Sequence, residues 1–275
     1  MNYLYFNYGK IPNYLNYSIK SIKKFEKDSN IFLASDQKID NRNVTNINLE
    51  QLKSKRVEYI KNLRYFNNWN SNSLWESSLL RIFYLYELAN FLQLNQFVHF
   101  DNDVVIFKPF NQIEKIVVKN KLNITPLSKD FLVFGYSYIH NLEIYNEICE
   151  CLINVYENSI EYENNYYGGK KLIEMKALFI IYDKFPHLFN FLPTHPKQSE
   201  SIIFDPASYG QYVSGVHKKR FSKKFTDSRH LLGNDLRNKI IKPIFKDKKP
   251  FVEYEGKKFD LVNLHIHSKK LRKFT

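Results

Sequence analysis

The sequence predicts an α/β fold in which a mainly parallel central sheet is flanked by helices. Through the first 110 residues, short apolar runs alternate with longer amphipathic stretches, the pattern of successive βαβ units. The nearly continuous apolar run from Gln96 to Phe100 indicates a central strand covered on both faces. The 275 residues suffice for one domain with a sizeable core, and we find neither an internal repeat nor a low-complexity linker. Residues 1–275 are therefore predicted to form a single domain.

Apolar spacing places the elements of the first half. Between Tyr14 and Lys27, apolar residues recur three or four positions apart, which predicts an amphipathic helix after a turn that contains Gly9 and Pro12. A longer helix over 74–92 carries apolar residues on more than one stripe, so most of its circumference should be buried. The strands expected here are 3–6, 30–36, 43–49 and 96–100.

Beyond Pro109 the order of elements is looser. We expect helices over 141–156 and 172–184. The polar, acidic stretch 154–165 is predicted to be the most mobile loop. The strands expected in this half are 122–127, 131–139, 201–204 and 261–267.

The positive charge is concentrated in one part of the chain. The net charge is +13, and the 59 residues from His217 onward hold 18 lysines and arginines against six acidic residues. Such a surface attracts polyanions: nucleic acid, anionic lipid headgroups or a diphosphate-bearing substrate. A solvated basic face without a partner is the alternative.

The N-terminal residues and the cysteines indicate the cellular compartment. The start lacks a basic stretch followed by a long apolar one, and no apolar run approaches the length of a membrane span. Cys149 and Cys151 stand two apart in a predicted helix, where their side chains diverge, so we expect free thiols. These features predict a cytoplasmic protein.

Two aspartates follow the central strand, at the sheet edge where open parallel sheets bind ligands. Asp101 and Asp103 stand between the apolar runs 97–100 and 104–107, where acidic side chains are costly to desolvate unless a cation compensates them. A hard divalent ion bound through carboxylate oxygens meets this need. The alternative is a surface turn between two strands.

The segment from helix to strand resembles the nucleotide-sugar core of bacterial GT-A glycosyltransferases, especially the retaining lipopolysaccharide enzymes. The resemblance is carried by Arg81 and by the run from Asp101 to Pro109, DNDVVIFKP. It implies the Rossmann-like GT-A fold, a nucleotide-sugar donor and a glycan or lipid-linked acceptor. It also implies that Asp101 and Asp103 bind Mn²⁺ or Mg²⁺, and that Asn102 reaches the ribose or the sugar.

A His-x-His pair near the C-terminus is the second candidate element. In a strand, His265 and His267 project to the same face, so either or both could serve one site. Similar families carry a C-terminal histidine that completes the metal shell, followed by lysines at the diphosphate. His267 with Lys273 six residues later fits that spacing, and Lys269 and Lys270 are the lysines expected at the diphosphate. Here Lys270 and the final Phe-Thr replace the glycine and Pro-Trp of those families, so the sequence does not decide which histidine binds metal.

A loop with one proline and two glycines, residues 204–215, suits close approach to a ligand. It resembles the acceptor-side segment of GT-A enzymes. The resemblance implies that Asp205 is an acid/base group and that Gln211 stabilises the developing oxocarbenium ion. The alternative for Asp205 is an Asp-Pro turn at the end of a strand.

Three further residues are candidates for binding the nucleotide sugar. Arg81 lies in an otherwise largely apolar helix, where an unpaired guanidinium is costly. It requires an anion, either a structural carboxylate such as Asp36 or Glu87, or the nucleotide diphosphate. Asn7 and Asp36 end the first two strands, where the base and ribose would lie in this fold.

The predicted function is metal-dependent transfer of a sugar, with UDP as the favoured nucleotide, in capsule or lipopolysaccharide synthesis at an anionic inner membrane surface. A basic nucleic-acid-binding protein is one rival, but the sequence holds no zinc-finger spacing and no RNP-like aromatic motif, so no nucleic-acid partner is expected. A metal-dependent nucleotidyltransferase or phosphoesterase, which also uses paired aspartates, is the other.

Overall fold

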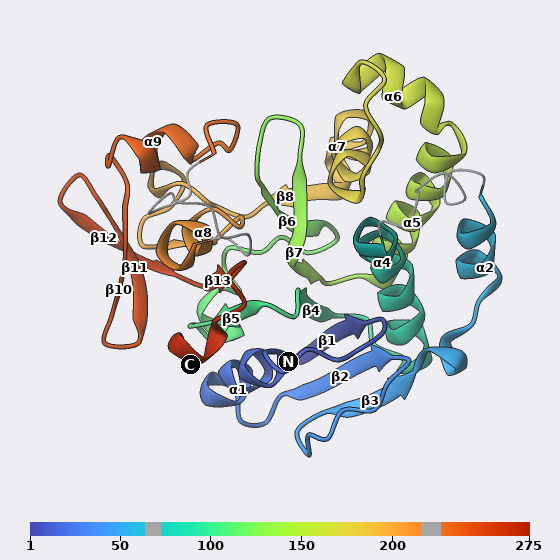
Figure 1. Ribbon diagram of the computed structural model, residues 1–275, viewed down its shortest axis with the longest axis horizontal. Helices are drawn as coiled ribbons and strands as arrows, with labels where there is room; N and C mark the ends of the chain where they lie inside the picture. Colours follow the sequence, from blue (N-terminus) through green and yellow to red (C-terminus); the bar gives the residue numbers. More distant parts are fainter. Residues whose placement is uncertain (64–72, 216–226) are drawn as a thin grey trace.

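A seven-stranded sheet forms the centre of the computed structural model, which describes residues 1–63, 73–215 and 227–275 (Figure 1). Its strand order is β3-β2-β1-β4-β7-β6-β8. Four of the six neighbouring pairs are parallel, and only β7 runs antiparallel to both of its neighbours. The predicted fold class, a mainly parallel sheet flanked by helices, is confirmed. The strands are β1 (Asn2–Asn7), β2 (Asn30–Ser35), β3 (Thr45–Asn48), β4 (Phe97–Phe100), β6 (Leu122–Pro126), β7 (Leu132–Ile139) and β8 (Phe189–Phe191).

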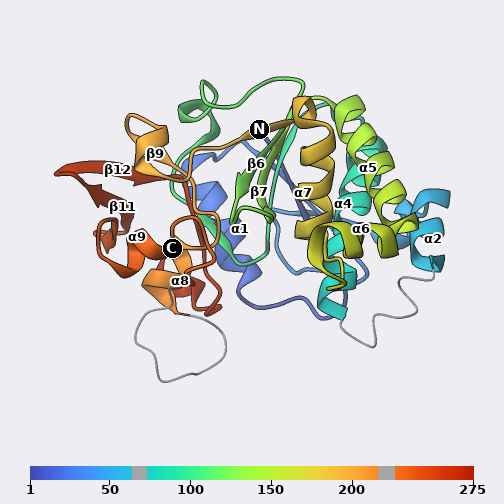
Figure 2. The ribbon, with the colours of Figure 1, turned by 90° about the horizontal axis from the view of Figure 1, so that it is seen from above.

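Helices cover both faces of this sheet, as Figure 2 shows. Alternation along β1 sends Leu4 and Phe6 into one apolar cluster, and Tyr3 and Tyr5 into another on the opposite face. Helix α1 packs in the second cluster, and helices α4, α5 and α7 pack in the first. The bounds of these helices are α1 (Leu15–Phe25), α4 (Ser73–Phe91), α5 (Leu142–Glu157) and α7 (Glu174–Lys184).

A two-stranded pairing joins the middle of the chain to its C-terminal part. β5 (Val104–Ile106) runs antiparallel to β13 (Asn263–His265), with Leu264 opposite Val105. Because β5 begins directly after the acidic pair, this pairing places the C-terminal histidines beside the ends of β1 and β4.

A four-stranded sheet of order β10-β11-β12-β9 lies away from the central sheet (Figure 1). Two-residue turns join its first three strands, with Asp247 and Lys248 at positive φ in one and Glu255 and Gly256 in the other. β10–β12 were not predicted from the sequence, because neither Asp-Lys nor Glu-Gly is among the strongest hairpin signals. The strands are β9 (Ile202–Ile203), β10 (Lys242–Lys246), β11 (Lys249–Tyr254) and β12 (Lys257–Leu261).

Two expectations about the second half are wrong. The stretch 154–165, predicted as a mobile loop, is the end of α5 and most of α6 (Ser159–Tyr167), because Tyr162 and Tyr166, four residues apart, pack against the apolar cluster beneath the acidic residues. The strand expected over 261–267 is broken into β12 and β13 and ends at His265.

The remaining elements are short. Cys149 and Cys151 lie in α5 as free thiols, as predicted. Within the described ranges, every helix is too short or too polar to cross a bilayer. The other helices are α2 (Lys55–Asn62), α8 (Tyr209–Ser214) and α9 (Gly233–Arg237), with 3-10 turns at Leu49–Leu52, Phe110–Gln112, Pro186–Leu188, Pro196–Gln198 and Leu271–Lys273.

Candidate metal and nucleotide-sugar site

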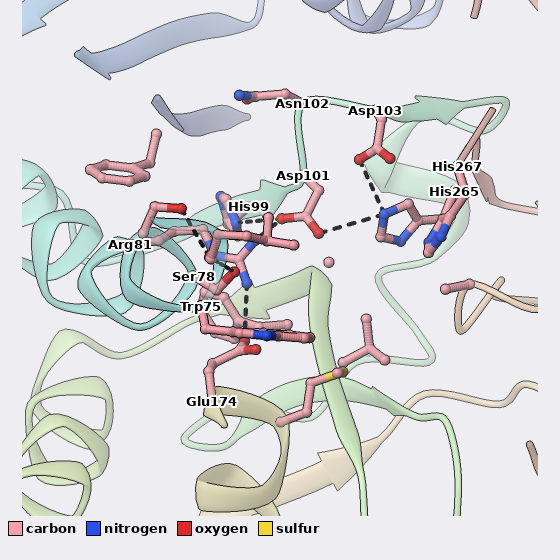
Figure 3. Close-up of a pocket in the computed structure, with 18 of the residues that line it drawn as sticks. Trp75, Ser78, Arg81, His99, Asp101, Asn102, Asp103, Glu174, His265 and His267 are labelled. Atoms are coloured by element: carbon pink, nitrogen blue, oxygen red, sulfur yellow. Dashed lines mark hydrogen bonds and ion pairs between the residues drawn. The ribbon is translucent and has the colours of Figure 1, made fainter. Parts of the chain in front are cut away.

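A pocket of about 400 Å³ lies at the C-terminal ends of β1 and β4 (Figure 3). Its walls come from the β4–β5 turn, α4, the start of α7, α8 and the segment that follows β13. Among the predicted site residues, Asp36, Asp205 and Lys270 lie outside the lining. The predicted residues that do line it are Asn7, Arg81, Asp101, Asn102, Asp103, Gln211, His265, His267 and Lys269.

Asp103 lies against two histidines from the C-terminal part of the chain (Figure 3). Its Oδ1 atom is 3.1 Å from Nε2 of His265, and ligand atoms of Asp103, His265 and His267 lie within 4.8 Å of one another. Burial acts to raise the pKa of Asp103, but His265 and Lys269 outweigh it and hold that pKa well below its usual range. The carboxylate is therefore ionised and able to hold a cation.

Backbone bonds fix the histidines beside the acidic pair. His265 pairs with Val104 across the β13–β5 ladder, and the Ile266 N–H donates to the Asp103 carbonyl at 2.9 Å. His267 lies beyond the strand, yet its ring centre is only 4.5 Å from that of His265. A turn, and not the alternation of a strand, brings the two imidazoles together.

Asp205 is buried outside the pocket lining. Its carboxylate accepts backbone N–H bonds from Tyr209 and Gly210, both at 2.8 Å, and from His265 at 2.9 Å. Burial raises the pKa of Asp205, although these three bonds oppose the rise. The carboxylate thereby ties the start of α8 to β13 and positions His265. Its predicted acid/base role stays a prediction.

Two glycines allow neighbouring groups to pack closely at the site, because they have no Cβ atom. A Cβ atom on Gly135 of β7 would lie 2.9 Å from Cε1 of His265 and 3.0 Å from Oδ2 of Asp101. A Cβ on Gly210 would lie 2.1 Å from the His265 carbonyl oxygen. Gly135 was not predicted as a site residue, because the residues that it contacts lie far away along the chain.

Gln211 and His267 form the third part of the cluster. The Gln211 Nε2 atom is 3.2 Å from Nδ1 of His267. Among the described residues, the buried Gln211 Oε1 and His267 Nε2 atoms have no hydrogen-bond partner. Burial, followed by His265, lowers the pKa of His267 to about 3, so the ring is neutral near pH 7. If the Gln211 amide turns over, its oxygen accepts from Nδ1–H and Nε2 keeps a lone pair for a metal.

Arg81 joins two acidic side chains on the opposite wall. Its Nη1 atom pairs with Asp101, and its Nη2 atom is 3.0 Å from Oε1 of Glu174. Burial raises the pKa of Glu174, although Arg81 opposes the rise. The structural partners considered from the sequence, Asp36 and Glu87, are wrong. Glu174 is 93 residues from Arg81 in the sequence, and no local pattern singled it out.

Amide side chains form the part of the pocket next to β1. The Asn102 amide donates to Oδ1 of Asn7 at 3.1 Å, and the Asn7 amide donates to the Gly9 carbonyl at 2.8 Å. Asp36 accepts the Gly9 N–H at 2.8 Å, so it shapes this loop from outside the lining. Tyr8 is 64% exposed at the rim and offers a free aromatic face.

The two lysines that follow the histidines differ. Lys269 pairs with Oδ2 of Asp103 and lines the pocket, whereas Lys270 is exposed and outside the lining. Lys269 is therefore the lysine that the geometry brings to the acidic pair.

Comparison with known proteins finds similar solved structures but no matching sequence. No protein-family model and no curated protein matches the sequence. Mouse xyloside xylosyltransferase 1, apo form, is similar at 12% identity and a TM-score of 0.47, over 70% of this chain and 86% of that one. The galactosyltransferase LgtC, in complex with donor and acceptor sugar analogs, is similar at 12% identity and a TM-score of 0.46, over 78% and 79%.

A third similar structure covers a smaller share of its own chain. The glycosyltransferase GlyE of Streptococcus pneumoniae TIGR4 is similar at 12% identity and a TM-score of 0.44, over 76% of this chain and 47% of that one. All three are glycosyltransferases, the class that the sequence resembles. Because these TM-scores are below 0.5, we base the function on the residues of this chain.

Proposed function

We propose that the protein is a metal-dependent glycosyltransferase that moves a sugar from a nucleotide sugar, with a UDP sugar as donor, to a glycan or lipid-linked acceptor. The observation that carries the proposal is the cluster of Asp103, His265 and His267, whose ligand atoms lie within 4.8 Å of one another in the pocket. A buried carboxylate, the His265 imidazole and the neutral His267 ring, whose Nε2 atom has no partner among the described residues, are groups that bind a divalent cation.

The donor set favours Mn²⁺ over Mg²⁺, because Mg²⁺ prefers oxygen ligands and Asp103 is joined by two imidazoles. When bound, such a cation supplies Lewis-acid stabilisation of the charge that develops on a leaving nucleoside diphosphate. In this proposal Asp103, His265 and His267 hold the metal. Asp101, already paired with Arg81, lies beside it.

The other pocket residues suit the rest of a nucleotide sugar. Tyr8 offers an aromatic face for a base at the rim, and the Asn7 and Asn102 amides can bind ribose hydroxyls. Arg81 and Glu174, a donor group beside an acceptor group, suit sugar hydroxyls on the opposite wall.

The acceptor and the place of action are inferred from charge. We propose that exposed lysines of β10–β12 hold the enzyme against an anionic cytoplasmic membrane surface, where a lipid-linked acceptor for surface polysaccharide would be presented. These lysines are Lys242, Lys246, Lys248, Lys249, Lys257 and Lys258.

Thermal or chemical unfolding with a panel of nucleoside diphosphates, each with and without Mn²⁺, tests the proposal. A ligand present at about 100 times its dissociation constant should add roughly 2.7 kcal/mol to the free energy of unfolding. Asp103→Asn should abolish this gain because it removes the carboxylate from the cluster. Asp247→Asn, at an exposed turn, removes the same charge and should keep the gain.

An undiminished gain in Asp103→Asn, or no gain with any nucleoside diphosphate, would overturn the proposal. Product analysis separates the rival activity. A glycosyltransferase releases intact UDP from a UDP sugar, whereas a nucleotidyltransferase or phosphoesterase releases pyrophosphate or phosphate.

A further inference from the structure

A lysine already holds the carboxylate that the proposed metal would need. The Lys269 ammonium pairs with Oδ2 of Asp103, while Oδ1 of the same carboxylate lies 3.1 Å from His265. The Asp103 side chain is only 6% exposed, so its charge would be costly without a cation beside it. Lys269 therefore occupies the electrostatic place of a metal ion.

The position of Lys269 is built into the backbone. The residue has a φ of 61°, a conformation that is unfavourable for a non-glycine residue, and its N–H donates to the Ile266 carbonyl at 2.9 Å. Its ammonium also lies 5.4 Å from the centre of the Tyr14 ring. The turn thus directs this side chain, and not that of Lys270, toward Asp103.

The same side chain can leave. Lys269 is 34% exposed, whereas Asp103 is fixed beneath it by the strand pairing and by His265. A lysine has a flexible four-carbon stem and a compact charge, so rotation about its side-chain bonds can carry the ammonium from one anion to another within the pocket.

We propose that Lys269 is an internal counter-ion of Asp103 that a divalent metal displaces, and that the displaced ammonium then binds the diphosphate of the substrate. The proposal rests on the metal site proposed above. Two consequences follow for the binding equilibria. Lys269 weakens the binding of metal alone, because it must first be displaced, and it strengthens the binding of a diphosphate once metal is present. Metal and diphosphate thereby favour each other through one side chain.

The test measures both equilibria in Lys269→Met. Binding of Mn²⁺ alone, followed by the electron paramagnetic resonance signal of free Mn²⁺, should tighten roughly five- to tenfold relative to the wild type. Binding of UDP in saturating Mn²⁺, followed by calorimetry, should weaken by roughly the same factor. A merely structural lysine would shift both affinities in the same direction, so the opposite signs are the diagnostic result.

Two further variants serve as controls. Arg272→Met removes a nearby exposed positive charge and should change the Mn²⁺ affinity less than about twofold, because exposed charges are strongly screened. Lys269→Arg keeps a cation at the position and should bind Mn²⁺ as weakly as the wild type. If Lys269→Met does not fold without metal, Lys269→Gln replaces it, because its amide can still donate to Asp103.

The outcomes separate this proposal from the function on which it rests. If the wild type binds no Mn²⁺, the metal site itself is wrong. If the wild type binds Mn²⁺ but Lys269→Met binds it no more tightly, the metal site stands and the counter-ion exchange is overturned.

Discussion

The two walls of the pocket use the same short motif in opposite ways. Asp101 pairs with Arg81 of α4, which it shares with Glu174 of α7, and its Oδ2 atom lies 3.6 Å from Nε2 of His265. Asp103, two residues later, faces β13, where one acid meets two imidazoles and a lysine. The first wall has more acids than bases, and the second has more bases than acids.

Distant partners, and not the motif, therefore decide what each aspartate does. The α4–α7 wall has its charges paired inside the folded protein, so changes there should mainly cost stability. The β5–β13 wall leaves the Nε2 of His267 without a partner among the described residues, so changes there should mainly cost ligand binding.

The largest loss of stability is expected from Arg81→Met. The substitution leaves Glu174, which is 3% exposed, without its cation and should lower the free energy of unfolding by about 3 kcal/mol in urea denaturation. Adding Glu174→Gln should restore part of the loss. Lys53→Met breaks an exposed pair with Glu50 and should leave the free energy of unfolding nearly unchanged, because solvent screens that pair. A stable Arg81→Met protein would show that this wall is not held by its ion pairs.

Gly135→Ala should damage both walls at once. The added methyl group meets His265 and Asp101, so those side chains must move, at a cost of about 1–3 kcal/mol in unfolding free energy. Stabilisation by Mn²⁺ should fall in the same variant, because His265 is displaced. Ser137→Ala, on the same strand, removes a buried hydroxyl with no partner in the described part of the chain and should be nearly neutral. Wild-type Mn²⁺ binding in Gly135→Ala would contradict this packing argument.

The smallest effect concerns pH and His267. Its pKa is about 3 in the folded protein and near 6.5 in an unfolded chain, so between these values only the unfolded state binds the proton. Stability from this group is therefore complete above pH 6.5 and declines as the pH falls. Between pH 6.5 and 5.5 the wild type should lose about 1 kcal/mol through this residue.

Urea unfolding in the presence of a chelator measures this slope. His267→Gln should flatten it, because the glutamine does not titrate. His187→Gln, on the surface, controls for the loss of a histidine and should keep the wild-type slope. Equal slopes in all three proteins would mean that His267 is not buried as described.

Much of the fold was predictable from local pattern. The burial of α4 around most of its circumference and the central position of β4 follow from apolar spacing within single segments. The aspartates at the end of β4 were predictable for the same reason. Strands β10–β12 were not, because their turns lack the usual hairpin residues and exposed lysines hide the alternation.

Contacts between residues far apart in the sequence could not be predicted. The pairing of Arg81 with Glu174 and the close approach of Gly135 to His265 join residues far apart in the sequence. A buried glutamate in a predicted helix gives no local signal of the arginine that it meets. The contact of Asp205 with β13 could not be predicted either. The proline after Asp205 suggested a turn or a catalytic loop, whereas the carboxylate accepts a hydrogen bond from the His265 N–H of β13.

The pairing of β5 with β13 also sets an order of events during synthesis. The ribosome delivers Asp103 about 160 residues before His265 and His267, so the nascent central sheet exposes its acidic pair long before the imidazoles emerge. Tight metal binding would then show that β13 has paired with β5. A chain whose synthesis stopped before β13 would bind the ion weakly, however well its first half had folded.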